Sequence, residues 1–383
     1  MRIFTEDQLL IQEAAHDFAA TEVADATKTG MAIYAQTGTA PFSFGLWDKA
    51  AALGYAGITV PEEYGGLGLG EVEELLVMEQ LSAFNPAIAT NLDGHNLATK
   101  TILHSGSEDQ RERYLPHLAS GEWCAAAAVT DPAGSTNFPE WTIEVTRDGD
   151  DYVINGTKHF CSNSQAAQLY AVYTKSEPGT PGPMDCFLVP AGTRGLEMGE
   201  LESFGRSGTN TGTVELNDVH VPACDKIPPS NLYTANWLAC GYLDFAAIML
   251  GRAQGVFDKT LAYVKQRTRR GRPLAQLQAV AHRIANMAMQ IEQVRSITFD
   301  AAQLWDAGTP NRALHSMAKI AAAEMIGDVS IQCAAMHGAA GSDPAVGIMS
   351  ALQTAPGAWN GEGPNDLHRD YIADELGITL DSM

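Results

Sequence analysis

The sequence predicts an α+β protein in which a helical region is followed by a small β region and then by a helical bundle. Apolar residues recur at helical spacing up to about residue 121, alternate with polar residues to about 228, and then return to long helical periods. With 383 residues, the chain is long for one hydrophobic core. We therefore expect an N-terminal helical domain at 1–121, a middle β domain at 122–228 and a C-terminal helical bundle domain at 229–383.

The first helix is predicted to begin after residue 5. Thr5 and Gln8 have the spacing of a capping box, and apolar residues then recur every four positions. Further helices are expected at about 43–53, 71–84, 88–104 and 108–119. The glycine-rich stretch 65–70 does not follow a predicted strand, so it indicates a turn between helices and not a dinucleotide-binding loop.

The β region is predicted from alternation and turn signals. Ile143 and Val145 alternate with polar residues, and an apolar stretch returns at Tyr152–Ile154 after the turn dipeptide Asp148-Gly149. Asn155-Gly156 is a second hairpin signal. Other strands are expected at Leu169–Tyr173, Cys186–Val189 and Thr213–Val221.

Two apolar stripes predict long helices after Pro229. Their members recur three or four residues apart, which is typical of the buried face of a bundle helix. The first stripe is Val280, Ile284, Met287, Ile291, Val294 and Ile297, and the second is Leu314, Met317, Ala321 and Met325.

Composition excludes several classes of partner. The 24 Lys and Arg against 46 Asp and Glu give a net charge of −22, which argues against nucleic acid or an anionic membrane surface. Six cysteines without a CxxC pair indicate neither a zinc site nor a disulfide framework, so we expect no metal. Without a signal-peptide pattern or an 18-residue apolar run, we expect a cytoplasmic protein with no membrane span.

Residues 265–272 carry five positive charges within this acidic chain. Arginine suits bidentate contact with phosphate, so the cluster could bind an anion. A solvated helix end that complements the helix dipole explains it equally well.

Three carboxylates are candidates for a catalytic base. Glu362 lies between two glycines and close to Trp359, where the backbone can bring it near a substrate, although an ordinary exposed loop glutamate fits the same pattern. Asp93, with His95 close by, lies in an apolar helical stretch and could line a pocket, and Asp244 lies in another.

Residues 54–66 (GYAGITVPEEYGG) and 110–121 (QRERYLPHLASG) resemble two signatures of the acyl-CoA dehydrogenase family, and the resemblance continues in order over nearly the whole chain. It implies an N-terminal α-helical domain, a middle domain of β-barrel or sandwich type, and a C-terminal four-helix bundle. It also implies FAD as cofactor. Residues 129–135 and 155–163 resemble the two flavin-binding motifs of the family's β domain.

The resemblance also implies site residues. Val129, Thr130 and Ser162 would bind the flavin ring, Phe160 would pack on it, and Ser135 would contact the thioester handle. Arg267 and Gln278 match residues at the start of the bundle, where the family's Arg binds the FAD pyrophosphate of a neighbouring subunit. Gly338 and Gly341 resemble the glycine motif before the catalytic region. Sharing FAD between subunits implies a homodimer or homotetramer.

Counting onward from the glycine motif brings the family's catalytic glutamate onto Glu362. This implies a dehydrogenase in which Glu362 takes the α-proton of an acyl thioester, hydride leaves for flavin N5, and an electron-transfer flavoprotein accepts the electrons. Asp244 and Asp93 are the secondary candidates for the base. The alternatives are a carrier-protein-bound substrate instead of CoA, a non-catalytic FAD-binding subunit of a heteromer, and a flavin oxidase or monooxygenase.

Overall fold

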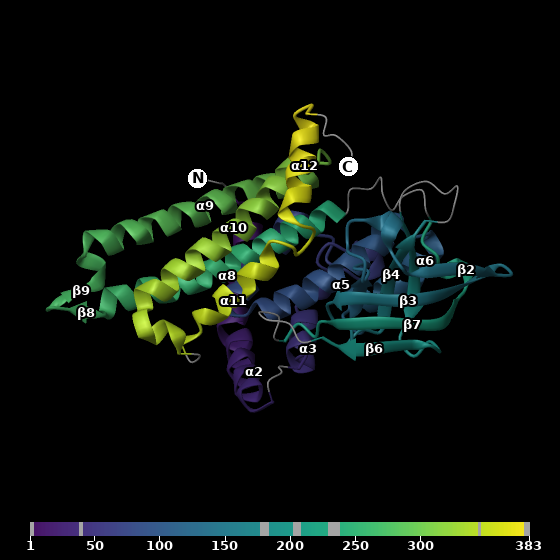
Figure 1. The fold of residues 1–383 in the computed structure, drawn as a ribbon, viewed down its shortest axis with the longest axis horizontal. Coiled ribbons are helices and arrows are strands. Elements are labelled where there is room, and N and C mark those ends of the chain that lie inside the picture. The colour runs from purple at the N-terminus through teal and green to yellow at the C-terminus, as the bar shows by residue number, and fades with distance from the viewer. Residues whose placement is uncertain are drawn as a thin grey trace. The chain divides into compact units, whose positions relative to one another are not determined.

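The computed structural model describes residues 4–37, 41–176, 184–201, 208–228, 238–343 and 346–378 (Figure 1). The predicted order of helices, strands and again helices is confirmed. Contacts group the chain into two compact units, each built from separate stretches of sequence. The first unit comprises Met1–Thr27, Glu71–Ala89 and Ala239–Met383, and the second comprises Lys28–Gly70 and Thr90–Leu238. These units follow contacts and not sequence order, so the three-domain division at 121 and 228 stays a prediction.

The N-terminal helices begin and end close to their predicted positions. The predicted capping box is present: the Gln8 amide donates to Thr5 Oγ1 at 3.2 Å, and the Thr5 amide donates to Gln8 Oε1 at 3.0 Å. The helices are α1 (Glu6–Phe18), α2 (Ala24–Thr37), α3 (Phe44–Ala52), α4 (Glu71–Phe84), α5 (Pro86–Ser105) and α6 (Glu108–Ala119), with a π-helical turn at Ala19–Val23 between α1 and α2.

Among the described residues of the second unit, seven strands form two sheets. The first sheet has the order β1-β4-β5, with β1 parallel to β4, and the second has the order β2-β3-β7-β6, with all pairs antiparallel. Every residue of β4 except the last is buried, so this strand belongs to the core. The strands are β1 (Ala125–Ala128), β2 (Glu144–Asp148), β3 (Asp151–Cys161), β4 (Leu169–Lys175), β5 (Met184–Pro190), β6 (Leu196–Glu200) and β7 (Gly212–Val221).

One predicted turn is wrong. Asp148 pairs with Asp151, so the hairpin between β2 and β3 forms at Gly149 as expected, but Asn155-Gly156 lies inside β3. There the register against β7 shifts, which is a β-bulge. Gly156 has φ of 144°, and an added Cβ would lie 2.9 Å from the Cα of Ile143. The glycine therefore permits a bulge and a close backbone approach.

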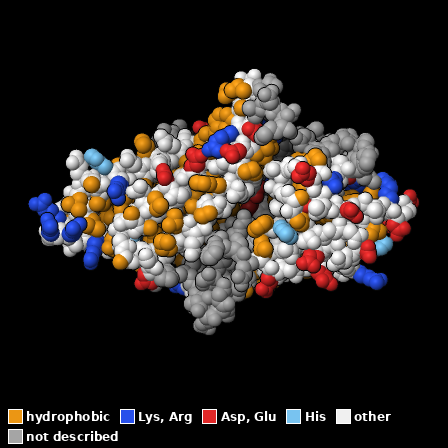
Figure 2. Space-filling model, in the orientation of Figure 1, with side chains coloured by type: hydrophobic (Ala, Val, Ile, Leu, Met, Phe, Trp, Pro, Cys, Tyr) orange, Lys and Arg blue, Asp and Glu red, His pale blue; other side chains and the backbone are white. Residues whose placement is uncertain are grey.

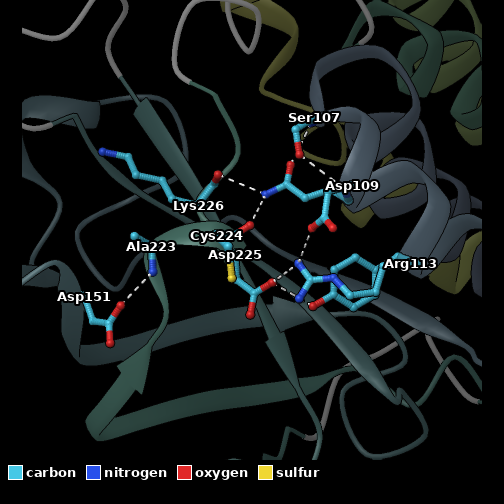
Figure 3. Close-up of polar contacts among 10 residues, drawn as sticks. Ser107, Asp109, Arg113, Asp151, Ala223, Cys224, Asp225 and Lys226 are labelled. Atoms are coloured by element: carbon cyan, nitrogen blue, oxygen red, sulfur yellow. Dashed lines mark hydrogen bonds and ion pairs between the residues drawn. The ribbon is translucent and has the colours of Figure 1, made fainter.

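Helix α6 is tied to the end of the sheet region by buried polar contacts (Figure 3). Gln110 Nε2 donates to the Cys224 carbonyl O at 2.7 Å. The Asp225 carboxylate accepts from the Tyr114 hydroxyl at 2.9 Å and pairs with Arg113 at 2.5 Å. Since Asp225 is buried, these charge-assisted bonds satisfy a carboxylate that would otherwise be costly to bury.

The first unit is helical. Its long helices bury one face each and run beside one another in Figure 1, as the two apolar stripes predict. No helix within the described ranges is both long and apolar enough to cross a membrane. Beyond α1 and α4, its elements are α8 (Leu238–Gln266), the short strands β8 (Thr268–Arg269) and β9 (Arg272–Pro273), α9 (Gln278–Asp306), α10 (Arg312–His337), α11 (Met349–Ala358) and α12 (Asn365–Glu375).

Helix α4 packs closely against α8 through two glycines. An added Cβ at Gly251 would lie 2.1 Å from the Glu79 carbonyl O, and one at Gly255 would lie 2.0 Å from the Ala83 carbonyl O. No side chain fits in either space. Glu79 also pairs with Arg295 of α9 at 2.8 Å, so a buried ion pair holds the same helix.

Candidate functional site

Two motif segments of the second unit lie side by side. One contains Val129 and Thr130 and follows β1, and the other is the end of β3. The His159 amide donates to the Thr130 carbonyl O at 2.7 Å, and Lys158 Nζ donates to the Val129 carbonyl O at 2.9 Å. The structure thus brings together residues that the sequence places about 30 positions apart.

Lys158 is a buried cation for which the sequence predicted no role. Its side chain is fully buried, and Nζ lies 3.7 Å from the centre of the Trp141 ring and 3.8 Å from Asp131 Oδ2. Burial lowers the pKa of Lys158 to about 7, against the attraction of Asp131. The presence of a lysine and an aspartate in the two motifs was the signal that could have suggested this pair.

Asp131 fixes the turn that carries Thr130. Its Oδ1 accepts from the amide of Ala133 at 3.0 Å and from the amide and hydroxyl of Thr142 at 2.9 Å each. Burial works to raise the pKa of Asp131, but these hydrogen bonds, led by the Thr142 amide, hold it below its usual value. The ionised carboxylate therefore acts as a rigid anchor for the loop.

The predicted flavin residues present an open surface beside this anchor. Phe160 adopts a left-handed backbone conformation with φ of 53°, and its ring is 50% exposed. Thr130, Ser135 and Ser162 are half-buried. Within the described part of the chain, the hydroxyls of Thr130 and Ser162 make no hydrogen bond. An exposed aromatic ring next to available hydroxyl donors suits a planar ligand with polar edges.

The turn of α5 that carries Asp93 and Gly94 packs near Ser162, whereas His95 belongs to the core. An added Cβ at Gly94 would lie 3.1 Å from the Cβ of Ser162, so this turn of α5 packs on the β3 segment. His95 is fully buried: Nδ1 accepts from the Ala125 amide at 3.0 Å, and Nε2 lies 3.1 Å from the Ala56 carbonyl O. Burial lowers its pKa to about 4, so His95 is a neutral structural residue and not a pocket-lining group.

Glu362 lies in the first unit, in the turn between α11 and α12. It is half-buried, and its backbone has φ of 52°. Its carbonyl O lies 2.9 Å from Nε2 of the buried His368 on α12. Lys319 of α10 donates to the Gly363 carbonyl O at 2.7 Å, immediately after Glu362. Hydrogen bonds from the buried side chains of His368 and Lys319 therefore hold the turn that contains Glu362. Such support is not expected for an ordinary exposed loop glutamate.

Asp244 lies near the same turn. It is buried on α8, and the next residue, Phe245, has its ring against Gly361. An added Cβ at Gly361 would lie 2.8 Å from Phe245 Cε2. Of the two secondary candidates for the base, the structure thus places Asp244 in the unit that carries Glu362, and Asp93 in the other unit.

Arg267 lies at the far end of the bundle from Glu362. It follows α8 and is exposed, as are Arg269, Arg270 and Arg272. Lys and Arg side chains gather at one tip of the bundle in Figure 2, where Figure 1 places β8 and β9. Phe245 of α8, whose ring lies against Gly361, is 22 residues before Arg267, which is about 33 Å at 1.5 Å per residue. Arg267 and Glu362 of one chain are therefore too far apart to act on the same ligand atoms.

The remaining predicted residues lie at the same end of the bundle as Arg267. Gln278 is the first residue of α9 and is exposed. Gly338 follows α10 with φ of 59°, and Gly341 is buried, where an added Cβ would lie 2.8 Å from the Ala334 carbonyl O. In the described ranges, no group of three or more His, Cys, Asp or Glu side chains could hold a metal ion.

Family models match three successive stretches of the chain. They are described as the N-terminal, middle and C-terminal domains of acyl-CoA dehydrogenase, and they match residues 5–122, 126–219 and 235–377. The chain belongs to the acyl-CoA dehydrogenase family. Members of this family are oxidoreductases that act on CH–CH bonds, so the predicted family, fold class and enzyme class are confirmed.

Individual relatives and solved structures are similar to the chain over most of their length. The chain is 31% identical to the mitochondrial short/branched chain specific acyl-CoA dehydrogenase of Bos taurus, over 97% of this chain and 86% of that protein. It is 30% identical to the caffeyl-CoA reductase–Etf complex subunit CarC of Acetobacterium woodii, over 88% of this chain and 89% of that protein. The FAD complex of PigA is similar with a TM-score of 0.90 and 26% identity, over 99% of both chains.

Acyl-CoA dehydrogenases depend on FAD, and the residues of the second unit fit this cofactor. The exposed Phe160 ring can pack on an isoalloxazine, and the hydroxyls of Thr130 and Ser162 can bond its polar edge. The rigid turn around Asp131 supports the first of these hydroxyls. The arginines beyond α8 suit the phosphates of the same cofactor.

Proposed function

We propose that this chain catalyses the α,β-dehydrogenation of an acyl thioester, with Glu362 as the base that removes the α-proton. The observation that carries the proposal is the position of Glu362, in a left-handed turn held by Lys319 and His368 within a chain of this family. A fixed carboxylate can be placed within reach of one acidic C–H bond.

Each predicted residue then has a distinct task. Thr130, Ser162 and the backbone at Val129 hold the flavin ring, and Phe160 packs on it. Ser135 contacts the thioester handle. FAD, when bound, accepts the hydride that leaves the β-carbon. Glu362 receives the α-proton, and a hydrogen-bonded thioester carbonyl makes that proton more acidic.

We further propose that the active form is a homodimer or homotetramer. Arg267, Gln278, Gly338 and Gly341 lie at the opposite end of the bundle from Glu362, about 33 Å along α8 from Phe245, so we infer that they complete the FAD site of a neighbouring subunit. Met289 of α9 and Ile331 of α10 are each 54% exposed, which supports contact between apolar helix faces.

We propose an electron-transfer flavoprotein as the electron acceptor. A relative with 30% identity is a subunit of a complex with such a protein. We propose coenzyme A as the handle of the substrate, with a carrier protein as the alternative that a panel of thioesters distinguishes.

The substitution Glu362→Gln tests the assignment of the base. We expect the variant to retain bound FAD, because Glu362 has no role in holding the cofactor, and to lose α-proton exchange by about 10²- to 10⁴-fold, the usual contribution of a general base. Exchange of deuterium into an acyl thioester, followed by mass spectrometry, measures this rate.

Asp244→Asn is the matched control, because Asp244 lies near the same turn on α8. It should keep exchange within a few-fold of wild type. If the Glu362→Gln variant exchanges at the wild-type rate, the assignment is wrong and Asp244 or Asp93 becomes the base to test.

A further inference from the structure

Lys319 is a fully buried lysine on α10. Its ammonium group donates three hydrogen bonds: to the carbonyl O of Trp359 at 3.3 Å, to that of Gly363 at 2.7 Å and to Asn365 Oδ1 at 2.8 Å. An ammonium has three donor hydrogens, so its hydrogen-bonding capacity is met in full. A buried lysine in such a setting is expensive to retain unless its bonds and charge serve a purpose.

The three acceptors surround Glu362. Trp359 directly follows α11, Gly363 follows Glu362, and Asn365 begins α12. Lys319 therefore connects the end of one helix, the turn and the start of the next helix through a single charged group. The turn between Trp359 and Asn365 is also closed by a backbone bond of 3.0 Å from the Asn365 amide to the Trp359 carbonyl O.

A second side chain, that of His368, holds the peptide group of Glu362 itself. His368 Nε2 lies 2.9 Å from the Glu362 carbonyl O, and Nδ1 lies 3.2 Å from Ser316 Oγ on α10. A carbonyl can only accept, so Nε2 carries the proton and Nδ1 accepts from the serine hydroxyl. Ser316 and Lys319 are one helical turn apart, so one face of α10 supports the turn at two points.

We propose that Lys319 is a positioning residue for the base: it fixes the turn that presents Glu362, and its buried charge favours the ionised carboxylate that proton abstraction requires. The proposal rests on the proposed function of Glu362. Lys319 does not touch the substrate. It acts through the conformation and the charge state of Glu362.

The charge balance supports this role. Burial lowers the pKa of Lys319 to about 8, while Glu362 acts to raise it. Attraction between two charges is mutual, so Lys319 stabilises the ionised form of Glu362 in turn. Removing the positive charge should therefore make Glu362 harder to ionise, and exchange should then require a higher pH.

Other charged or titratable groups near the turn also affect the pKa values of Lys319 and His368. Arg369 lowers the pKa of Lys319, and Arg369 itself is paired with Asp366 and Glu324 at 2.8 and 2.7 Å. Burial lowers the pKa of His368 to about 4, so this ring is neutral at the pH of catalysis. Among the described residues, the rings of Tyr242 on α8 and Tyr371 on α12 also contact His368, and Arg312 on α10 acts to lower its pKa.

A purely structural role is the competing explanation, because a cation at the C-terminal end of α11 stabilises that helix. The two explanations differ in the pH dependence of α-proton exchange. Loss of a structural contact lowers the rate at every pH. Loss of the charge also moves the acid limb of the profile, where Glu362 takes up its proton.

The experiment compares Lys319→Met with Arg369→Gln, using butyryl-CoA and isovaleryl-CoA as probes and measuring α-proton exchange from pH 5 to pH 10. Both variants remove one positive charge from neighbouring helices, but Arg369 is exposed and its hydrogen bonds go to Glu324 and Asp366, not to the turn. We expect Lys319→Met to keep its FAD, to lose about 10- to 100-fold in exchange at neutral pH, and to shift its acid limb upward by about one pH unit. We expect Arg369→Gln to shift the limb by less than about 0.3 unit, because its charge is screened by solvent.

A folded Lys319→Met variant whose acid limb does not move overturns the proposal, whatever its rate. Lys319→Gln, which keeps neutral donors in the same place, serves as a second variant and should shift the limb equally with a smaller loss of rate. If neither variant folds, the wild-type profile decides: exchange should fall as Lys319 loses its proton above about pH 8, and a rate that stays flat from pH 7 to pH 10 overturns the proposal. A Glu362→Gln variant that retains exchange instead overturns the proposed function.

Discussion

The backbone of Glu362 adopts a conformation that glutamate takes rarely. Its φ of 52° lies in the left-handed region, where a residue with a Cβ is destabilised by about 1 kcal/mol or more. Gly363, the next residue, has φ of 92°. Hydrogen bonds from Lys319 and His368 hold the turn in this conformation, so the backbone strain is maintained. Strain held at one carboxylate in this way is typical of a functional site.

Gly361→Ala tests how tightly the turn is packed. The added Cβ would lie 2.8 Å from Phe245 Cε2, so the ring must move, and we expect a loss of about 1–3 kcal/mol in the free energy of unfolding. Since Phe245 also lies 5.4 Å from Lys319 Nζ, exchange at the α-carbon should fall as well. Thermal and urea unfolding, with the exchange assay, measure both effects.

Gly357→Ala is the matched control for this substitution. Gly357 lies in α11 and an added Cβ there meets nothing within 4 Å. Alanine favours a helix over glycine by about 0.5–1 kcal/mol, so this variant should be as stable as wild type or slightly more. Equal losses in the two variants would show that Phe245 does not pack against Gly361 as described.

The sequence predicts Glu362 as the base but does not mark the residues that hold its turn. Two flanking glycines and the family motif made Glu362 a candidate. Lys319 falls inside a regular helix, and its partners lie 40 to 46 positions away, so no local pattern marks it. Lys158 and Asp131 do lie in the two motif segments, but the sequence does not show that their side chains pair, because the segments are about 30 residues apart.

Helix α8 lies between the turn of the proposed base, Glu362, and the predicted phosphate contact, Arg267. Its N-terminal end carries Phe245 near the proposed base, and beyond its C-terminal end lies the exposed hairpin of β8 and β9 with Arg267. A single long helix thus fixes the distance between the base and the predicted phosphate contact. This separation is the basis for the proposal that a neighbouring subunit completes the FAD site.

Arg267→Ala tests the predicted phosphate contact. A charge-assisted bond to a phosphate contributes about 1.5–3 kcal/mol, so we expect the Kd for FAD to rise about 10- to 100-fold. Fluorescence titration of the apoprotein with FAD measures it. Arg194→Ala, at an exposed arginine of the second unit, should leave the Kd unchanged, and an unchanged Kd in Arg267→Ala as well would contradict the assignment.

Elements with a clear period were predictable, and those shaped by their neighbours were not. Helices α3 to α6 begin and end within two residues of the prediction. Strand β1 consists of four alanines, a composition that favours a helix, and it becomes a strand by parallel pairing with β4. Asn155-Gly156 has the sequence of a hairpin turn, but pairing with β7 makes it a bulge.

At the scale of the whole molecule, the order of regions followed from the sequence, but the grouping of the helices did not. Helix α4 belongs to the same compact unit as the C-terminal bundle. The close approach at Gly251 and Gly255 and the ion pair between Glu79 and Arg295 join segments about 170 to 220 residues apart. Periodicity reports that a helix has a buried face, and it carries no information about which distant element covers that face.

Anaerobic reduction of the bound flavin by acyl thioesters tests the central claim most directly. The purified holoenzyme should bleach on addition of at least one saturated acyl thioester from a panel that presents each acyl group on CoA and on a carrier protein, and the α,β-unsaturated thioester should appear in equal amount. Bleaching by the CoA series supports the CoA handle, and bleaching by the carrier series alone assigns the carrier instead. A yellow protein whose flavin no thioester reduces would contradict the claim and favour a non-catalytic FAD-binding subunit.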